Sequence, residues 1–313
     1  MNKTAHVAAS AAGLIGQTPV VELSRVWGGP GRIVAKAEFL LPGGSVKDRA
    51  ARAIIDAARA DGRLKPRAPV VEMTSGNMGA GLAVVCAALG HPLVVTMSAG
   101  NSSQRARMLE ALGAEVILVP QIAGEPGQVT GPDIAAAARM AEQLASERGG
   151  FYVDQFNAPE GKVAHESGTA RELLDAVCGS IDGWTACVGT GCTFLGVARA
   201  LRMANPSVMC GAVEPAGCQV LAGQAVKKAK HLLQGAGYGS VPPMWEPGLM
   251  SISIAVSDEE AAIWKQRLAT KEGLHVGFTA AANVCAAANM LSSGVLKPNA
   301  TVATVLCDTG LKY

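Results

Sequence analysis

The stretch Pro69-Val-Val-Glu-Met-Thr-Ser-Gly-Asn-Met-Gly79 joins a short apolar run to a polar turn that contains glycine and asparagine. Valine-rich apolar runs of this length favour a strand. The alanine-rich run at residues 80–89, after the turn, favours a helix. This stretch therefore predicts a strand that leads through a polar turn into a helix, which is the repeating unit of α/β folds.

The same alternation of strand and helix patterns runs along most of the chain. Short apolar runs predict further strands at residues 32–36, 92–97, 115–119, 184–188, 209–214 and 302–306. Longer alanine-rich or amphipathic runs predict helices at residues 46–60, 102–112, 134–148, 163–177, 194–203, 257–270 and 279–293. Repeated alternation of this kind predicts an α/β fold in which parallel sheets are covered by helices on both faces.

Length and composition limit the classes of protein to consider. The chain has 313 residues, which corresponds to about two domains at roughly 150 residues each. Hydrophobic residues make up 49% and aromatic residues 4%, so small aliphatic side chains must fill the core. The net charge of +2 argues against nucleic acid or an anionic membrane as a partner. We interpret the one basic run, Lys227-Lys-Ala-Lys-His231, as the solvated face of a helix.

Cysteine spacing and the N-terminal residues indicate whether the protein binds metal and in which cellular compartment it works. None of the eight cysteines forms a CxxC or another metal-type pair, so we expect no metal site. Residues 1–6 lack the apolar stretch of a signal peptide. Apolar runs elsewhere are interrupted before they reach membrane-spanning length. We therefore expect a cytoplasmic protein that makes no use of a membrane.

The segment Pro42-Gly-Gly-Ser-Val-Lys47-Asp-Arg49 leads into the helix predicted at residues 46–60. Ser45 is a suitable N-cap, and Asp48 completes a capping-box pattern with it. Lys47 then falls in the first helical turn, where the positive end of the helix dipole disfavours an ammonium group. That misfit makes Lys47 a candidate for imine formation, although the segment taken alone favours an ordinary exposed lysine.

Two polar loops, each between a strand and a helix, are candidate anion sites. In Thr74-Ser-Gly-Asn-Met-Gly79, hydroxyls, an amide and the N–H groups of a helix start suit a carboxylate. In Gly189-Thr-Gly-Cys-Thr193, small residues and hydroxyls suit a single phosphate. The second loop lacks the lysine of a Walker A motif, and Phe194 stands where a dinucleotide fingerprint needs its third glycine. Taken alone, each loop is equally compatible with a tight structural turn.

Several further segments occur in an order that resembles one family. They are Ile15-Gly-Gln-Thr-Pro-Val-Val-Glu-Leu23, Lys36-Ala-Glu-Phe39, Arg107-Met-Leu-Glu-Ala-Leu-Gly-Ala114, Gln155-Phe-Asn157, Val213-Glu-Pro215, Gln234-Gly-Ala-Gly237 and Leu306-Cys-Asp-Thr-Gly310. With the segments above, they resemble fold-type II enzymes that use pyridoxal 5′-phosphate (PLP). The greatest resemblance is to the cysteine synthase (O-acetylserine sulfhydrylase) and cystathionine β-synthase group. It implies two domains, each with a twisted, mostly parallel sheet flanked by helices, as in the β-subunit of tryptophan synthase.

The resemblance also implies a role for each matching position. Lys47 would hold PLP as a Schiff base and carry the α-proton of the substrate. The residues for the substrate carboxylate would be Thr74, Ser75, Asn77, Met78 and Gln155, and Asn77 would also face the ring hydroxyl of PLP. The residues for the phosphate would be Gly189, Thr190, Gly191, Cys192 and Thr193. Thr309 would hydrogen-bond the pyridine nitrogen, and its neutral hydroxyl would make the ring a weaker electron sink, which favours prompt β-elimination.

The implied reaction is PLP-dependent β-replacement on a serine-derived amino acid such as O-acetylserine or O-phosphoserine. Loss of the leaving group would form an aminoacrylate, and a small nucleophile would add to it to give cysteine or another β-substituted alanine. We expect residues 1–45 and 152–313 to form a larger PLP-binding domain. Residues 46–151 would form a smaller, mobile domain for the substrate carboxylate. The expected assembly is a homodimer.

Four departures from the family pattern leave both substrates open. Met78 replaces a threonine of the carboxylate loop, and Cys192 replaces a glycine of the phosphate loop. Residues 278–281, Phe-Thr-Ala-Ala, replace Ile-Ser-Ser-Gly, and residues 238–247 replace a shorter segment. Met78 is a bulky, adaptable wall, which suggests a specialised relative that makes an unusual β-substituted alanine. We expect neither a haem-binding leader nor a C-terminal regulatory module.

Three alternatives remain at this point. A PLP-dependent β-elimination lyase, serine/threonine dehydratase or racemase is one, but these relatives usually carry Ser-Phe-Lys-x-Arg, whereas this chain has Ser-Val-Lys47-Asp-Arg. A non-catalytic regulatory protein with the PLP fold is the second, and the presence of Lys47 and Thr309 argues against it. An NAD-dependent dehydrogenase is the third, and the incomplete glycine fingerprint disfavours it.

Overall fold

The computed structural model describes residues 7–125, 127 and 129–312. Residues 1–6, on which the expectation about a signal peptide rests, lie outside the described residues. The chain forms two compact units. The smaller unit contains the described residues up to Gly16, Leu41–Gly43 and Lys47–Asp154. The larger unit contains Gln17–Leu40, Gly44–Val46 and the described residues from Gln155 onward.

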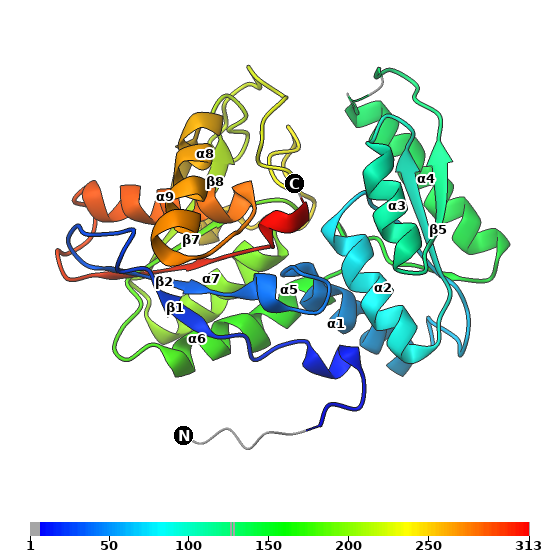
Figure 1. Ribbon diagram of the computed structural model, residues 1–313, viewed down its shortest axis with the longest axis horizontal. Helices are drawn as coiled ribbons and strands as arrows, with labels where there is room; N and C mark the ends of the chain where they lie inside the picture. The colour runs from blue at the N-terminus through cyan, green and yellow to red at the C-terminus, as the bar shows by residue number, and fades with distance from the viewer. Residues whose placement is uncertain (1–6, 126, 128, 313) are drawn as a thin grey trace. The chain divides into compact units, whose positions relative to one another are not determined.

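The smaller unit is built on a parallel sheet of four strands in the order β5–β4–β3–β6. Figure 1 shows the edge strand β5 of this sheet next to helix α3. The strands are β3 (Val70–Met73), β4 (Leu93–Ser98), β5 (Glu115–Val119) and β6 (Phe151–Tyr152). The helices are η1 (Ala11–Leu14), α1 (Lys47–Ala60), α2 (Asn77–Leu89), α3 (Ser103–Ala111) and α4 (Gly131–Glu147). Val71 and Val94 share a core with Ala141 and Ala145 of α4. Small alanine side chains let α4 pack closely on these strands.

The larger unit is built on six strands in the order β1–β2–β10–β7–β8–β9. They are β1 (Val20–Glu22), β2 (Arg32–Lys36), β7 (Gly183–Cys187), β8 (Met209–Pro215), β9 (Ile252–Val256) and β10 (Thr301–Val305). Only the edge strand β1 is antiparallel to its neighbour. The α-helices are α5 (Glu160–Ala164), α6 (Ala170–Ala176), α7 (Cys192–Ala204), α8 (Asp258–Arg267) and α9 (Phe278–Ser292). Shorter helical turns are η2 (Glu38–Leu40), η3 (His165–Thr169), η4 (Pro247–Leu249), η5 (Leu268–Glu272) and η6 (Gly310–Lys312), of which η3 and η5 are π-helical.

Helices cover both faces of the larger sheet, because its strands are apolar on both sides. Val302 of β10 packs in a core with Ala286 and other residues of α9. The next residue, Ala303, packs in a second core with Leu173 of α6 and Val197 of α7. Successive strand residues point to opposite faces, so this pair shows that α9 and the α6–α7 layer lie on opposite sides. The expected α/β fold with two helix-covered sheets is confirmed.

The predicted elements differ from the observed ones mainly at their ends. Helix α2 begins at Asn77 rather than residue 80, and α7 begins at Cys192 rather than residue 194. Residues of both candidate anion loops therefore belong to the first turn of a helix. The predicted helix at 163–177 is interrupted by the π-helical turn η3. Strands β1, β6 and β9 have no predicted counterpart. Strands β1 and β6 have only three and two residues, and so short a run pairs only when a neighbouring strand is present.

Two other expectations concern the surface. The basic run Lys227–His231 is exposed or half-buried, but it lies in an irregular loop and the predicted helix face is wrong. The loop is fixed instead by two backbone N–H groups, of Lys227 and Lys228, which both donate to the Gly217 carbonyl. Within the part of the chain that the structure describes, no helix combines the length and the apolar character needed to cross a membrane.

The division into units differs from the expected domains near the N-terminus. Leu41–Gly43 and the described residues up to Gly16 cluster with the smaller unit, whereas we expected them with residues 152–313. The smaller unit resumes at Lys47. The mobility of the smaller domain and its role with the carboxylate remain predictions.

Candidate active site

Lys47 is the first residue of α1 and is half-buried. Its helical turn is fixed by Asp48, a fully buried residue whose carboxylate accepts a hydrogen bond from the Gly43 amide at 2.6 Å. A Cβ on Gly43 would lie 2.4 Å from Oδ1 of Asp48, so only glycine fits beside this carboxylate. Gly81 of α2 lets that helix pack closely on this turn, because a Cβ there would lie 3.1 Å from the backbone of Asp48. The lysine therefore starts from a rigid turn.

Thr309 lies on a segment of the larger unit that is held on both sides. On one side, its amide donates to the Gly44 carbonyl at 3.1 Å, and the Val46 amide donates to the Cys307 carbonyl at 2.8 Å. On the other side, Thr309 forms an isolated antiparallel β-bridge with Val276. The Thr309 hydroxyl oxygen accepts a hydrogen bond from the Leu311 amide at 3.3 Å. With a lone pair used in this way, the hydroxyl is set to donate its own hydrogen.

The loop Gly189–Thr193 follows β7 and leads into α7. A Cβ on Gly189 would lie 2.1 Å from the Gly235 carbonyl oxygen, and Gly191 has a φ of +90°, so both positions require glycine. Gly191 is the N-cap of α7 and has no side chain to cap it, although the Cys192 amide donates to the Thr190 hydroxyl oxygen at 3.4 Å. Uncapped N–H groups at a helix start bind anions. The glycines and hydroxyls of this loop therefore fit the phosphate of PLP.

The loop Thr74–Gly76 leads from β3 into α2 in the same manner. Gly76 is the N-cap of α2 and again no side chain caps the helix. The Thr74 amide is bonded to the Thr96 carbonyl at 3.1 Å, and the Thr74 hydroxyl accepts from the Gly76 amide at 3.3 Å. Ser75 and Asn77 are half-buried. Hydroxyls at an uncapped helix start fit a carboxylate.

Arg105 contacts this loop, and the sequence did not predict that contact. It lies on α3, and its guanidinium donates to the Ser75 hydroxyl oxygen at 3.0 Å. Because a guanidinium can only donate, the Ser75 hydroxyl must direct its own hydrogen elsewhere. The two residues are 30 positions apart, and no local sequence pattern links them.

Two further predicted residues are placed as follows. Met78 is in the first turn of α2 and only 2% exposed. Gln155 belongs to the larger unit, whereas Thr74, Ser75, Asn77 and Met78 belong to the smaller one. The predicted roles of all five with the substrate carboxylate remain predictions.

The departures at residues 238–247 and 278–281 have structural roles. Trp245 stacks on Phe194 of α7 with ring centroids 5.6 Å apart, and Tyr238 makes an edge contact with Phe156 at the same distance. Ala280 and Ala281 are fully buried in a core of the larger unit. Both departures therefore pack the larger unit around the loop Gly189–Thr193 and around α9.

A cavity of about 280 Å³ lies at the start of α9. The residues that line it are Ala262, Lys265, Gln266, Ala269, His275 and Phe278. The Lys265 ammonium lies 5.4 Å from the Phe278 ring centroid. Burial lowers the pKa of Lys265, and the Asp308 carboxylate partly opposes this shift. The Phe278 departure thus forms one wall of this cavity.

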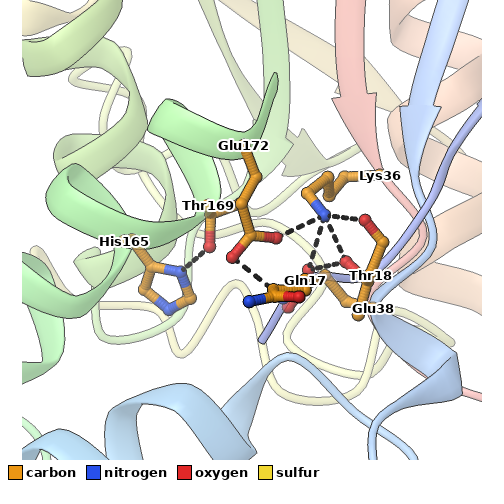
Figure 2. Close-up of polar contacts among 7 residues, drawn as sticks. All are labelled: Gln17, Thr18, Lys36, Glu38, His165, Thr169 and Glu172. Carbon is orange, nitrogen blue, oxygen red and sulfur yellow. Dashed lines mark hydrogen bonds and ion pairs between the residues drawn. The ribbon is translucent and has the colours of Figure 1, made fainter. Parts of the chain in front are cut away.

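Figure 2 shows a polar cluster that explains two motifs outside the loops. Lys36, at the end of β2, is fully buried, and its ammonium lies 2.7 Å from the Glu172 carboxylate and also contacts Thr18. Glu38 is fully buried and accepts a hydrogen bond from the Thr18 hydroxyl at 2.6 Å. The Gln17 amide donates to Glu172 at 3.0 Å. The motif segments at 15–23 and 36–39 are therefore structural, since they tie the first strands of the larger unit to α6.

Comparisons with known proteins agree with this arrangement. Residues 11–308 match the model of a family described as pyridoxal-phosphate dependent enzyme. Cysteine synthase of Staphylococcus aureus (strain N315) is 37% identical over 302 residues, which cover 96% of this chain and 93% of that protein.

Solved structures with similar folds add to the match. The crystal structure of O-ureido-L-serine synthase has a TM-score of 0.88 and 32% identity, and the alignment covers 98% of this chain and 94% of that one. The O-acetylserine dependent cystathionine β-synthase of Helicobacter pylori also has a TM-score of 0.88, with 28% identity and coverage of 99% and 98%.

Proposed function

This chain belongs to the pyridoxal-phosphate dependent enzyme family, and we propose that it replaces the β-substituent of a serine-derived amino acid. The family match confirms the resemblance and the PLP cofactor that the sequence motifs predicted. The similarity to cysteine synthases over 96% of the chain supports the β-replacement type of enzyme. The observation that carries the proposal is the placement of Lys47 on the first turn of α1, in a chain that also has the glycine-built loop Gly189–Thr193 at the start of α7.

Bound PLP supplies an electron sink for the carbanion formed when the substrate loses its α-proton. Lys47 would hold the cofactor covalently and then accept and return that proton through Nζ. Thr309 would donate its hydroxyl hydrogen to the pyridine nitrogen, since Leu311 occupies one of its lone pairs. A neutral hydroxyl adds no full charge to the ring.

The loop residues would bind the two anionic groups. Gly189, Thr190, Gly191, Cys192 and Thr193 would hold the phosphate through the start of α7. Thr74, Ser75 and Asn77, with Gln155, would orient the substrate carboxylate, and Met78 would shape the adjoining wall. These contacts would place the α-carbon near Lys47, and positioning of this kind is a large part of catalysis.

The substrates are the finer part of the proposal. O-acetylserine or O-phosphoserine would serve as donor, and sulfide or another small nucleophile would give cysteine or a different β-substituted alanine. Similarity to O-ureido-L-serine synthase as well as to cysteine synthases supports a search beyond sulfide. We further propose a homodimer in the cytoplasm, and a smaller unit that moves when it binds the carboxylate.

The test uses purified protein and Lys47→Ala. Wild-type protein should show the visible absorbance of lysine-bound PLP and should consume one of the donors only when a nucleophile is added. Lys47→Ala should lose that absorbance, and turnover should fall by about 10³-fold. Wild-type protein without visible absorbance, or a Lys47→Ala variant with unchanged turnover, would disprove the proposal.

The products distinguish the alternatives. Ammonia and a keto acid formed without an added nucleophile would identify an elimination lyase or dehydratase. Lysine-bound PLP with no reaction of any donor would identify a non-catalytic protein. A mass spectrum of the product formed with a panel of thiols and amines would name the nucleophile.

A further inference from the structure

His165 is a fully buried imidazole in the larger unit, and both of its ring nitrogens contact hydroxyl groups. Nδ1 lies 2.9 Å from the hydroxyl oxygen of Thr169, as Figure 2 shows. Nε2 lies 3.3 Å from the hydroxyl oxygen of Thr193. Thr193 belongs to the loop proposed for the phosphate, whereas Thr169 lies one helical turn beyond His165. The imidazole therefore connects the phosphate loop to the helical layer beneath it.

Close helix packing brings this imidazole to the loop. A Cβ on Gly196 of α7 would lie 2.4 Å from the Lys162 carbonyl oxygen and 2.9 Å from the Glu166 amide nitrogen. Only glycine permits this approach of α7 to the segment made by α5 and η3. Because Thr193 lies one turn before Gly196 on α7, the same approach places the ring of His165 next to the Thr193 hydroxyl.

The next turns of the same segment are also fixed. The π-helical turn η3 runs from His165 to Thr169 and continues into α6, which carries Glu172. Glu172 is bonded to the buried ammonium of Lys36 at 2.7 Å. A π-helical turn inside a longer helix often marks a functional position. Here it carries a buried polar ring on a segment that an ion pair holds in place.

When the imidazole is neutral, the hydrogen-bonded row Thr169–His165–Thr193 can run in two directions. In one, the Thr169 hydroxyl donates to Nδ1 and Nε2–H donates to the Thr193 oxygen, so the hydrogen of Thr193 is left to point into the loop. In the other, Thr193 donates to Nε2 and presents only lone pairs to the loop. A phosphate needs donors, so it selects the first direction.

We propose that His165 is a positioning residue that orients the Thr193 hydroxyl as a hydrogen-bond donor to the phosphate of PLP. This inference rests on the proposed function, because it requires the loop at Gly189–Thr193 to hold that phosphate. His165 itself contacts Thr193 rather than the cofactor. Its loss weakens binding of the phosphate group and leaves the rest of the cofactor's contacts intact.

The experiment compares two substitutions of His165, each of which keeps one of its two hydrogen bonds. In His165→Gln, the amide reaches the position of Nε2 and can still donate to Thr193. In His165→Asn, the amide reaches only the position of Nδ1 and can still contact Thr169. The dissociation constants of PLP and of pyridoxal, which lacks the phosphate, are measured by absorbance titration of each apoenzyme. The ³¹P chemical shift of bound PLP is a second readout.

His165→Asn should weaken PLP binding by about tenfold, as expected for the loss of one hydrogen bond, and should leave pyridoxal binding unchanged. His165→Gln should stay within about threefold of wild type for both ligands. The ³¹P chemical shift of bound PLP should differ from the wild-type value in His165→Asn and match it in His165→Gln. Thermal unfolding of both variants identifies any general loss of stability.

Three results would overturn the inference. PLP and pyridoxal weakened alike would make His165 a structural residue only. Equal PLP affinity of His165→Asn and wild type would remove its role while leaving the proposed function intact. A wild-type apoenzyme that binds no PLP would instead refute the proposed function, and the inference with it.

Discussion

Helices α2 and α7 begin alike, but their loops are held by different chemistry. Each follows a parallel strand, each has glycine at its N-cap, and neither is capped by a side chain. The loop before α7 is buried at Thr190, Gly191 and Cys192 and is supported by a buried imidazole. The loop before α2 is half-buried at Ser75 and is supported by the Arg105 guanidinium.

This difference matches the two ligands proposed for the loops. A resident cofactor needs a cradle that stays formed, and buried contacts with close glycine packing supply one. A substrate must come and go, and a half-buried loop beside a cation can attract a carboxylate without being closed over it. Similar helix starts can therefore serve a permanent and a transient anion, according to the residues that support each loop.

The largest expected effect comes from adding a methyl group to each loop. Gly189→Ala would place Cβ 2.1 Å from the Gly235 carbonyl oxygen, whereas Gly76→Ala meets nothing within 4 Å. The first should raise the dissociation constant of PLP by about 10- to 100-fold. The second should change it by less than about threefold. Absorbance titration of the two apoenzymes measures both values.

Equal losses of PLP affinity in the two variants would contradict this difference, because the loop before α2 would then be as closely packed as the one before α7. A Gly189→Ala variant that binds PLP as wild type does would show that Gly235 moves to make room. Thermal unfolding separates both results from general instability.

The next effect concerns the support of Ser75. Arg105→Gln removes the charged donor to its hydroxyl and should raise the KM of the amino-acid donor by about tenfold, since hydrogen bonds to charged groups contribute ~1.5–3 kcal/mol. PLP affinity should not change, because Arg105 lies on α3, outside the loop proposed for the phosphate. Steady-state kinetics with the preferred donor and a PLP titration measure the two quantities.

Arg107→Gln is the matched control for this variant. Arg107 lies on the same helix, is exposed, and contacts Ser103 at 3.3 Å rather than Ser75. Both substitutions remove one positive charge. If Arg107→Gln raised KM as much as Arg105→Gln, the effect would come from the loss of positive charge on α3 and not from the contact with Ser75.

The sequence predicts the loops far better than their supports. Strands β3 and β7 and the helices after them follow from local apolar patterns, and glycine with hydroxyl residues marks the turns. Arg105 and His165 act across 30 and 28 positions. Their placement depends on how helices pack, as at Gly196, and no local pattern reports that packing. The short strand β1 and the loop at Lys227–His231 were missed for the same reason, since pairing and turn contacts with distant residues decide them.

The smallest expected effect comes from a helix whose N-terminus is capped by its own side chains. In α8, the Ser257 hydroxyl accepts from the Glu260 amide at 3.1 Å, and the Glu260 carboxylate accepts from the Ser257 amide at 2.8 Å. Ser257→Ala should lower the free energy of unfolding by about 1 kcal/mol. It should leave PLP affinity and donor KM unchanged, because this helix start uses its N-cap serine and the glutamate at its third position to bond its own backbone rather than a ligand. Ser292→Ala is the control, since the Ser292 hydroxyl only donates back to the Ala288 carbonyl of its own helix, and its effect should stay within about 0.5 kcal/mol. Denaturant unfolding and PLP titration of the two serine variants decide the point. Suppose that Ser257→Ala weakened PLP binding as much as Gly189→Ala is expected to. Side-chain capping would then not distinguish structural helix starts from ligand-binding ones, and the contrast of α2 and α7 with α8 would be wrong.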